Sequence, residues 1–98
     1  MKVRWSSLAV EDLKSIARYI AKDDPAAARR FADKLKRRAE SAGRFPNRGR
    51  IAPELGRENV RELIEGNYRI IYRVEINTVD ILTLFEGHKQ MGDLDHQD

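Results

Sequence analysis

The spacing of apolar residues changes near residue 60, and this change constrains the fold more than any other feature of the chain. Before it, apolar side chains such as Leu13, Ile16 and Ile20 recur every three or four positions, as on one face of a helix. Beyond it, apolar and polar side chains alternate, as in a half-buried strand. The sequence therefore predicts an α+β fold in which helices come first and most of the sheet follows.

Two helices are expected before the change of spacing. The first spans residues 8–22 and follows Ser6-Ser7, whose hydroxyls can cap its first turn. Asp24 can cap the second helix, and Pro25 suits its first position because the N–H that proline lacks is unbonded there. Gly43 is placed to end it. Because the turn between the helices is short, they should form an antiparallel hairpin.

Four strands are expected around this hairpin. Residues 2–5 form the first, residues 44–59 are a connecting loop, and the other strands are residues 60–64, 68–74 and 79–85. The element order is then β-α-α-β-β-β. We expect the helix hairpin to pack on one face of a small antiparallel sheet.

The dipeptide Gly66-Asn67 sets the register of the sheet, since it is a two-residue hairpin signal that pairs Ile64 with Arg69. Directly opposed residues share a face. The face expected to pack on the helices carries Leu63, Tyr68, Ile70, Tyr72, Val74, Ile81, Thr83 and Phe85. The other face is expected to carry Val60, Glu62, Ile64, Arg69, Ile71, Arg73, Leu82, Leu84 and Glu86. An apolar patch rimmed by charge indicates a partner site, and the alternative is that a terminal segment of the chain covers it.

Charge is unevenly distributed although the net charge is only +3. Residues 25–50 carry nine basic and two acidic side chains, whereas residues 51–98 carry five basic and ten acidic ones. A basic middle can attract a polyanion or an acidic protein, and the alternative is a solvated helix face without a partner.

The chain contains no cysteine, and its two histidines lie at 88 and 96. Disulfides, thiolate metal sites and Cys nucleophiles are thereby excluded, and we expect neither a metal nor another cofactor. No apolar run is long enough for a membrane span or a signal peptide, so we expect a cytoplasmic protein that does not contact membranes. Residues 1–90 should form one domain and residues 91–98 a short, acidic, disordered tail.

Short segments in a fixed order between residue 3 and about residue 89 resemble a known family. They are Asp12-Leu13, Tyr19-Ile20-Ala21, Pro25 to Phe31, Phe45-Pro46, Gly49-Arg50, Pro53-Glu54-Leu55-Gly56, Arg61-Glu62-Leu63-Ile64 and Tyr68-Arg69-Ile70-Ile71-Tyr72-Arg73-Val74. In this order they resemble the ParE branch of the ParE/RelE superfamily, the toxins of type II toxin–antitoxin modules. The resemblance implies a toxin held in a hetero-oligomer by a cognate antitoxin, whose C-terminal segment wraps it.

The resemblance leaves two targets open. ParE-like toxins stabilise the cleaved-DNA state of DNA gyrase, whereas RelE-like toxins cut mRNA in the ribosome. RelE-like enzymes resemble one another in placing basic residues at alternate positions of the strand before the hairpin, and a Tyr near the C-terminus. Here Val60 and Glu62 occupy those strand positions and no Tyr follows Tyr72. The sequence therefore favours a gyrase poison that needs no catalytic residue.

Two alternatives remain beside the gyrase poison. One is a ribosome-dependent mRNA endonuclease that uses Arg69, His88 and Lys89. The other is a nucleic-acid binder that uses the basic residues 25–50. The chain also departs from the ParE-like pattern, because Glu86-Gly87-His88-Lys89 stands where a His-Gly-Arg-Arg-like run is common.

These hypotheses assign the candidate site residues. Antitoxin binding is expected at Ile64, Arg69, Ile71, Arg73, Leu82 and Leu84. Target binding is expected at His88, Lys89, Arg37 and Arg38. The alternative for Arg69 and Arg73 is that they only form ion pairs with Glu62 and Glu86.

Overall fold

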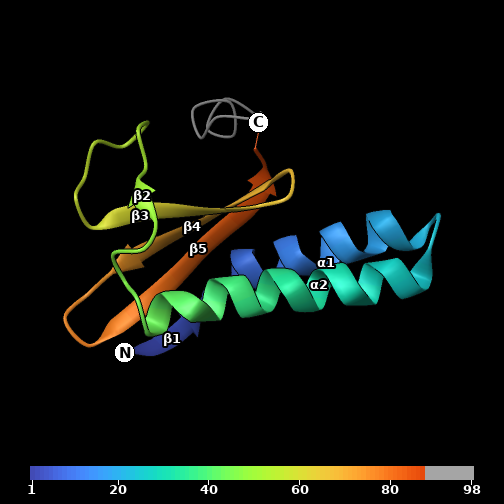
Figure 1. The fold of residues 1–98 in the computed structure, drawn as a ribbon, viewed down its shortest axis with the longest axis horizontal. Coiled ribbons are helices and arrows are strands. Elements are labelled where there is room, and N and C mark those ends of the chain that lie inside the picture. Colours follow the sequence, from blue (N-terminus) through green and yellow to red (C-terminus); the bar gives the residue numbers. More distant parts are fainter. Residues whose placement is uncertain (88–98) are drawn as a thin grey trace.

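The computed structural model describes residues 1–87 and confirms the α+β architecture (Figure 1). Its elements are β1 (Lys2–Trp5), α1 (Ser7–Ala21), α2 (Pro25–Glu40), the 3-10 helix η1 (Ser41–Gly43), β2 (Arg50–Ile51), β3 (Val60–Glu65), β4 (Tyr68–Val74) and β5 (Thr78–Glu86). The strands form one sheet in the order β1-β5-β4-β3-β2. Strand β1 pairs with β5 in parallel and the other pairs are antiparallel, so the sheet is mixed and not purely antiparallel as predicted.

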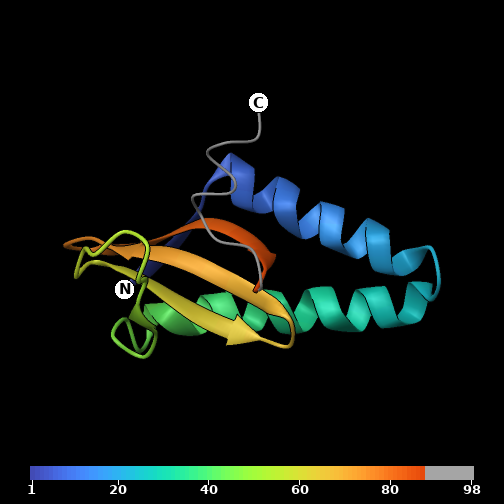
Figure 2. The ribbon, with the colours of Figure 1, turned by 90° about the horizontal axis from the view of Figure 1, so that it is seen from above.

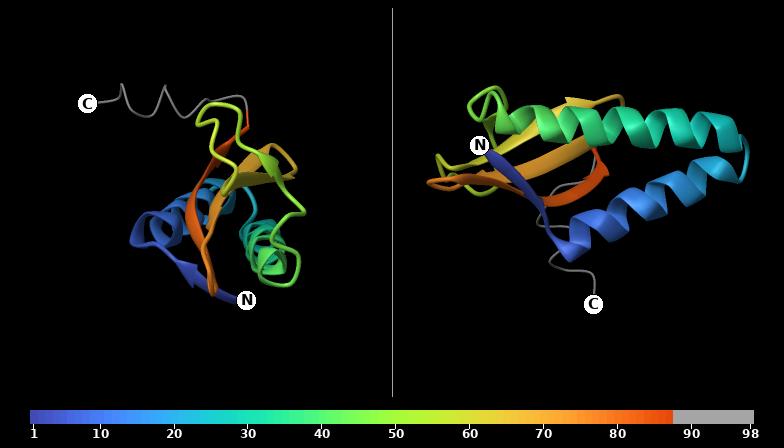
Figure 3. Two further views of the ribbon diagram at one scale, coloured as in Figure 1. Left: turned by 90° about the vertical axis from the view of Figure 1, so that its left-hand side faces the viewer. Right: turned by 90° about the horizontal axis from the view of Figure 1, so that it is seen from below.

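The two helices form the predicted antiparallel hairpin, with the predicted caps. The Ser6 hydroxyl accepts the Ala9 N–H at 2.9 Å, and the Asp24 carboxylate accepts the Ala27 N–H at 3.1 Å. The helices lie close together at their connecting turn and diverge toward the sheet (Figure 2). Helix α1 packs on β5, whereas α2 packs on β3 (Figure 3). Neither helix is long and apolar enough to cross a membrane, nor is any other helix within residues 1–87.

The β3–β4 hairpin has the predicted register. Ile64 pairs with Arg69, and Gly66 takes a φ of 59°, a conformation that favours glycine at this turn. The sequence did not predict β2, a two-residue strand in the expected loop, where Arg50 pairs with Glu62. Its shortness leaves no alternation of apolar and polar residues to detect.

A β-bulge between β4 and β5 changes which residues of β5 face the helices. Ile71 pairs with Thr83 and Tyr72 pairs with Ile81, so that Leu82 is an extra residue. One extra residue reverses the alternation beyond it. The predictions that Leu84 lies away from the helices and that Phe85 faces them are therefore wrong.

The helix-packed core contains Leu84 together with residues of both helices and three strands. Its buried members are Ala9, Ile16, Leu35, Ala39, Ala42, Leu63, Ile70, Tyr72, Val79, Ile81 and Leu84. The start of α1 also bonds to the bulged part of β5. Ser6 Oγ donates to the Leu82 carbonyl at 2.8 Å, and the Asp12 carboxylate accepts the Leu84 N–H at 3.0 Å. These bonds satisfy backbone groups of β5 beyond the end of β1.

Candidate functional site

The sheet face opposite the helix-packed core, here called the open face, carries a second apolar cluster. Its buried members are Ala52, Val60, Ile71 and Phe85, with Leu82 packed against them. Ala52 is fully buried, and its N–H donates to the Val60 carbonyl at 2.9 Å. The internal segment that begins at Ala52 therefore covers part of the predicted patch, which the sequence had assigned to a partner or to a terminal segment.

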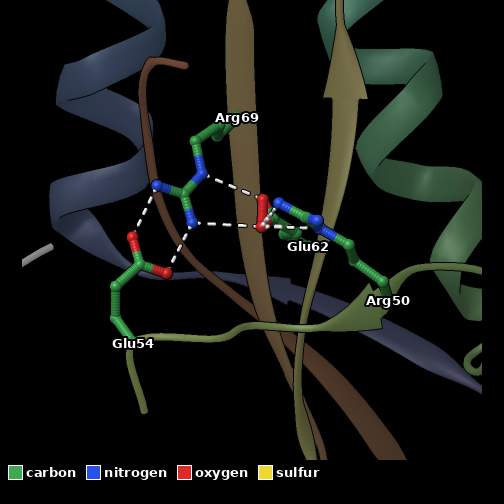
Figure 4. A network of polar contacts seen from close by, with 4 residues as sticks. All are labelled: Arg50, Glu54, Glu62 and Arg69. Atoms are coloured by element: carbon green, nitrogen blue, oxygen red, sulfur yellow. Dashed lines mark hydrogen bonds and ion pairs between the residues drawn. The ribbon is translucent and has the colours of Figure 1, made fainter. Parts of the chain in front are cut away.

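Arg69 on β4 binds two carboxylates across the open face. Its Nε and Nη2 donate to Glu62 at 2.9 and 3.1 Å, and its Nη1 and Nη2 donate to Glu54 at 2.7 and 2.8 Å. Glu62 on β3 also accepts from Arg50 Nε at 3.1 Å. Figure 4 shows the Arg69 guanidinium between the two carboxylates, with Arg50 at the other side of Glu62. The four residues are called the Arg69 network below.

The centre of this network is buried. Arg69 is 4% exposed and Glu62 is 1% exposed. The pKa of the Arg69 guanidinium is raised, mainly by its hydrogen bonds to Glu54 and further by those to Glu62, although burial opposes the shift. The Phe85 ring lies 5.1 Å from the guanidinium carbon and covers part of the remaining surface. Arg69 is thus a charged side chain that the chain itself neutralises.

This arrangement determines what the open face can do chemically. A cation that stabilises a reacting phosphate must direct its donors at the phosphate oxygens. Arg69 instead directs four bonds at Glu54 and Glu62, and these carboxylates would repel a phosphate. The predicted ion pair of Arg69 with Glu62 is confirmed.

A second charge cluster lies where β1, β5 and β4 meet. Asp80 accepts from Arg4 Nε at 2.8 Å and from Arg73 Nη2 at 3.2 Å, and Arg73 also pairs with Glu75 at 2.6 Å. The pKa of Asp80 is lowered, mainly by the hydrogen bond from Arg4 and to a smaller extent by that from Arg73, although burial opposes the shift. The structure pairs Arg73 with Asp80 and Glu75, where the sequence predicted Glu86.

The structure separates the predicted antitoxin-binding residues by exposure. Ile64 is 47% exposed, and Leu82 and Arg73 are partly exposed on the open face. Ile71 lies on the same face and is fully buried. Leu84 lies in the helix-packed core, as described above.

Two of the four predicted target-binding residues, Arg37 and Arg38, lie within the described part of the chain, on α2. Arg37 is exposed on α2 and pairs with Asp33 at 3.2 Å. Arg38 is only partly exposed. Burial raises the pKa of the Tyr72 hydroxyl, and the positive charge of Arg38 opposes part of this increase. His88 and Lys89 lie outside the described residues. Within residues 1–87 the structure holds no group of three side chains suited to bind a metal ion.

Sequence reasoning missed Glu54, Arg50 and Asp80 as parts of the charge clusters. Glu54 and Arg50 lie in the expected loop, where no periodicity assigns a side chain to a face. Asp80 was not singled out, although its strand was predicted. It lies two positions before Leu82, and alternation along the strand would have placed it on the open face with Leu82.

Comparison with protein families matches most of the chain to one family. The model described as the ParE toxin of the type II toxin–antitoxin system, parDE, matches residues 3–91. The Sinorhizobium fredii protein Y4kP is 35% identical over 92 residues, which are 91% of this chain and 91% of that protein. Toxin RelE2 of Caulobacter vibrioides is 37% identical over 83 residues, which are 85% of this chain and 91% of that protein.

Two solved structures have a similar fold. A chain of the chromosomal ParDE system from P. aeruginosa superposes with a TM-score of 0.72 at 21% identity, over 88% of this chain and 95% of that one. A chain of the toxin–antitoxin complex RelBE2 from Mycobacterium tuberculosis superposes with a TM-score of 0.60 at 27% identity, over 87% of this chain and 95% of that one.

Proposed function

The chain belongs to the ParE toxin family of type II toxin–antitoxin systems, and from this membership we propose that it binds DNA gyrase and holds it in a DNA-cleaved state. In this proposal the toxin performs no chemistry of its own. It acts in the cytoplasm, where gyrase works on the chromosome, and a cognate antitoxin neutralises it.

The observation that carries this proposal is the state of Arg69. The rival function, a ribosome-dependent mRNA endonuclease, would use Arg69 with His88 and Lys89 to activate and stabilise a reacting phosphate. In the structure Arg69 is bonded to Glu54 and Glu62. An arginine that is neutralised in this way does not supply the charge stabilisation that a reacting phosphate would need from it. Binding to gyrase makes no such demand on Arg69.

The rival has two observations in its favour, the similarity to Toxin RelE2 of Caulobacter vibrioides and the similarity to a chain of the RelBE2 complex from Mycobacterium tuberculosis. Both similarities concern the whole domain and assign no residue a catalytic role. We therefore keep the endonuclease as the second candidate.

The gyrase contacts are proposed at His88 and Lys89 and at Arg37 and Arg38 on α2. The antitoxin is proposed to cover the part of the open face that the chain leaves accessible. This surface comprises Ile64, Leu82 and Arg73. Ile71 and Arg69 lie on the same face but are buried by the chain itself, and Leu84 lies in the helix-packed core on the other side of the sheet.

Brief expression of the toxin without its antitoxin tests the proposal. DNA breaks and cleaved transcripts are measured in the same cells. The experiment is run in one strain whose gyrase is sensitive to the toxin and in another whose gyrase carries a substitution that makes it resistant to the toxin. The proposal expects DNA breaks that disappear in the resistant background and transcripts that stay intact. Cleaved transcripts without DNA breaks would favour the endonuclease.

A further inference from the structure

A hollow of about 630 Å³ lies beside the C-terminal end of α2 and is called the basic groove here. The cations Lys36, Arg37, Arg44 and Arg48 line it, together with the aromatic ring of Phe45. Lys36 and Arg37 come from α2, whereas the other three belong to the segment between η1 and β2. Two elements therefore converge on one positively charged surface.

The two carboxylates that line the groove, Asp33 and Glu40, offset only part of this charge. Asp33 pairs with Arg37 at 3.2 Å, and Glu40 accepts the Trp5 indole N–H at 3.1 Å. Among residues 1–87, no carboxylate forms an ion pair with Lys36, Arg44 or Arg48. Three cations are thus available to an anionic ligand with several charges.

Phe45 adds a second kind of contact. Its side chain is 50% exposed, which is unusual for a phenylalanine, and the Arg48 guanidinium lies 4.3 Å from its ring centre. An aromatic ring and a guanidinium next to free cations are the groups on which proteins stack unpaired bases while they hold the phosphates. An acidic protein surface would use the cations and leave the ring without a role.

The segment that carries Phe45 and Arg48 is fixed by the core. The Tyr72 hydroxyl is buried, accepts the Gly49 N–H at 3.0 Å and donates to the Pro46 carbonyl at 2.7 Å. A Cβ atom on Gly49 would collide with the Glu62 carbonyl oxygen and lie 2.7 Å from the Tyr72 hydroxyl. A binding surface held in place in this way loses little conformational entropy when a ligand binds.

We propose that the basic groove binds a single strand of DNA. Lys36, Arg44 and Arg48 hold successive phosphates, and an unpaired base stacks against the accessible part of the Phe45 ring. The choice of DNA over RNA rests on the proposed function, because a gyrase poison meets cleaved DNA. The choice of a nucleic-acid strand over a protein rests on Phe45 and the free cations alone.

The test is the fluorescence anisotropy of a labelled 12-nucleotide DNA strand titrated with the full chain at several salt concentrations. Three phosphate contacts predict a slope of log K against log salt of about −2, since each contributes about −0.7 for a single strand. Arg44→Glu should weaken binding about tenfold or more and make the slope shallower. Phe45→Leu should weaken binding of the single strand about tenfold and leave binding of a duplex of the same sequence nearly unchanged.

Arg30→Glu is the matched control, because it makes the same charge change on α2 outside the groove, and it should weaken binding less than about threefold. Urea unfolding of each variant shows whether the fold is kept. Equal losses from Arg30→Glu and Arg44→Glu would overturn the proposal, as would binding of poly-glutamate in place of DNA. Tighter binding of the matching RNA strand would overturn the choice of DNA. The titration contains no gyrase, so its failure is distinct from failure of the gyrase assay.

Discussion

Glu62 is the residue on which the open face depends, because it is a buried carboxylate that bonds to both Arg69 and Arg50. Removing one member of a buried ion pair costs about 3–5 kcal/mol, and we expect the lower end of that range for Glu62 because Arg69 keeps its bonds to Glu54. Arg50 stands at the other extreme, since its side chain is 69% exposed and water can replace its partner.

We therefore expect Glu62→Gln to lower the free energy of unfolding by about 3 kcal/mol. Arg50→Gln, which removes the largely exposed partner of the same carboxylate, should cost less than about 1 kcal/mol. Urea unfolding followed by circular dichroism measures both. If the two variants lost similar amounts of unfolding free energy, burial of the Arg69 network would not determine how much it contributes to stability.

Asp80 predicts a specific pH dependence of stability. Its pKa in the folded chain lies below the ordinary value of 3.8, because Arg4 and Arg73 stabilise its charged form. Near and below that value the unfolded chain takes up the proton more readily than the folded chain does. The stabilisation from Asp80 is therefore complete above the ordinary pKa and is lost as the pH falls through the lower, folded pKa.

The expected outcome is that the wild-type chain loses stability between about pH 5 and pH 2, and that Asp80→Asn loses less over the same range. Urea midpoints at half-unit steps of pH measure the two slopes. Parallel curves for the two proteins would show that Asp80 is not the source of the dependence.

At the scale of the elements, the β-bulge at Leu82 decides which β5 side chains enter which core. Leu84 is 2% exposed among the helices, whereas Ile64 on β3 is 47% exposed on the open face. Leu84→Ala should lower the free energy of unfolding by about 2–4 kcal/mol, because it leaves a cavity that the helices cannot fill. Ile64→Ala should cost less than about 1 kcal/mol. Unfolding by urea compares them, and a larger loss for Ile64→Ala would contradict the observed alternation of β5.

The elements that the sequence predicted correctly depend on neighbouring residues. The caps at Ser6 and Asp24 and the turn at Gly66 act over a few positions, so their residue types suffice. The bulge at Leu82 and the parallel pairing of β1 with β5 depend on residues far apart in the chain, which no local pattern encodes.

The same distinction applies to the candidate site. Alternation placed Ile64, Arg69, Ile71 and Arg73 on one face correctly, because they belong to the hairpin whose turn was recognised. It could not reveal that Glu54 reaches Arg69, since a loop residue has no period. The sequence therefore did not indicate that Arg69 is 4% exposed and bonded to Glu54 within the chain.

For the molecule as a whole, the antitoxin proposal predicts that binding depends on the accessible part of the open face. Leu82→Asp should weaken the complex at least about tenfold, because it places a charge in an apolar contact. Leu8→Asp is the control, since Leu8 is 58% exposed on α1. Titration calorimetry with the antitoxin encoded beside the toxin gene measures both. Unchanged affinity of Leu82→Asp would place the antitoxin on another surface.

We propose that this toxin binds gyrase while Arg69 remains neutralised, and a single pair of reactions tests this proposal. Purified toxin is incubated with gyrase, ATP and supercoiled plasmid, and the DNA is examined after denaturation of the protein. A parallel reaction contains translating ribosomes and labelled mRNA. We expect linear plasmid to accumulate only when toxin and gyrase are both present, and the mRNA to stay intact. Cleavage of mRNA in the ribosomal A site, without linear plasmid, would contradict the proposal.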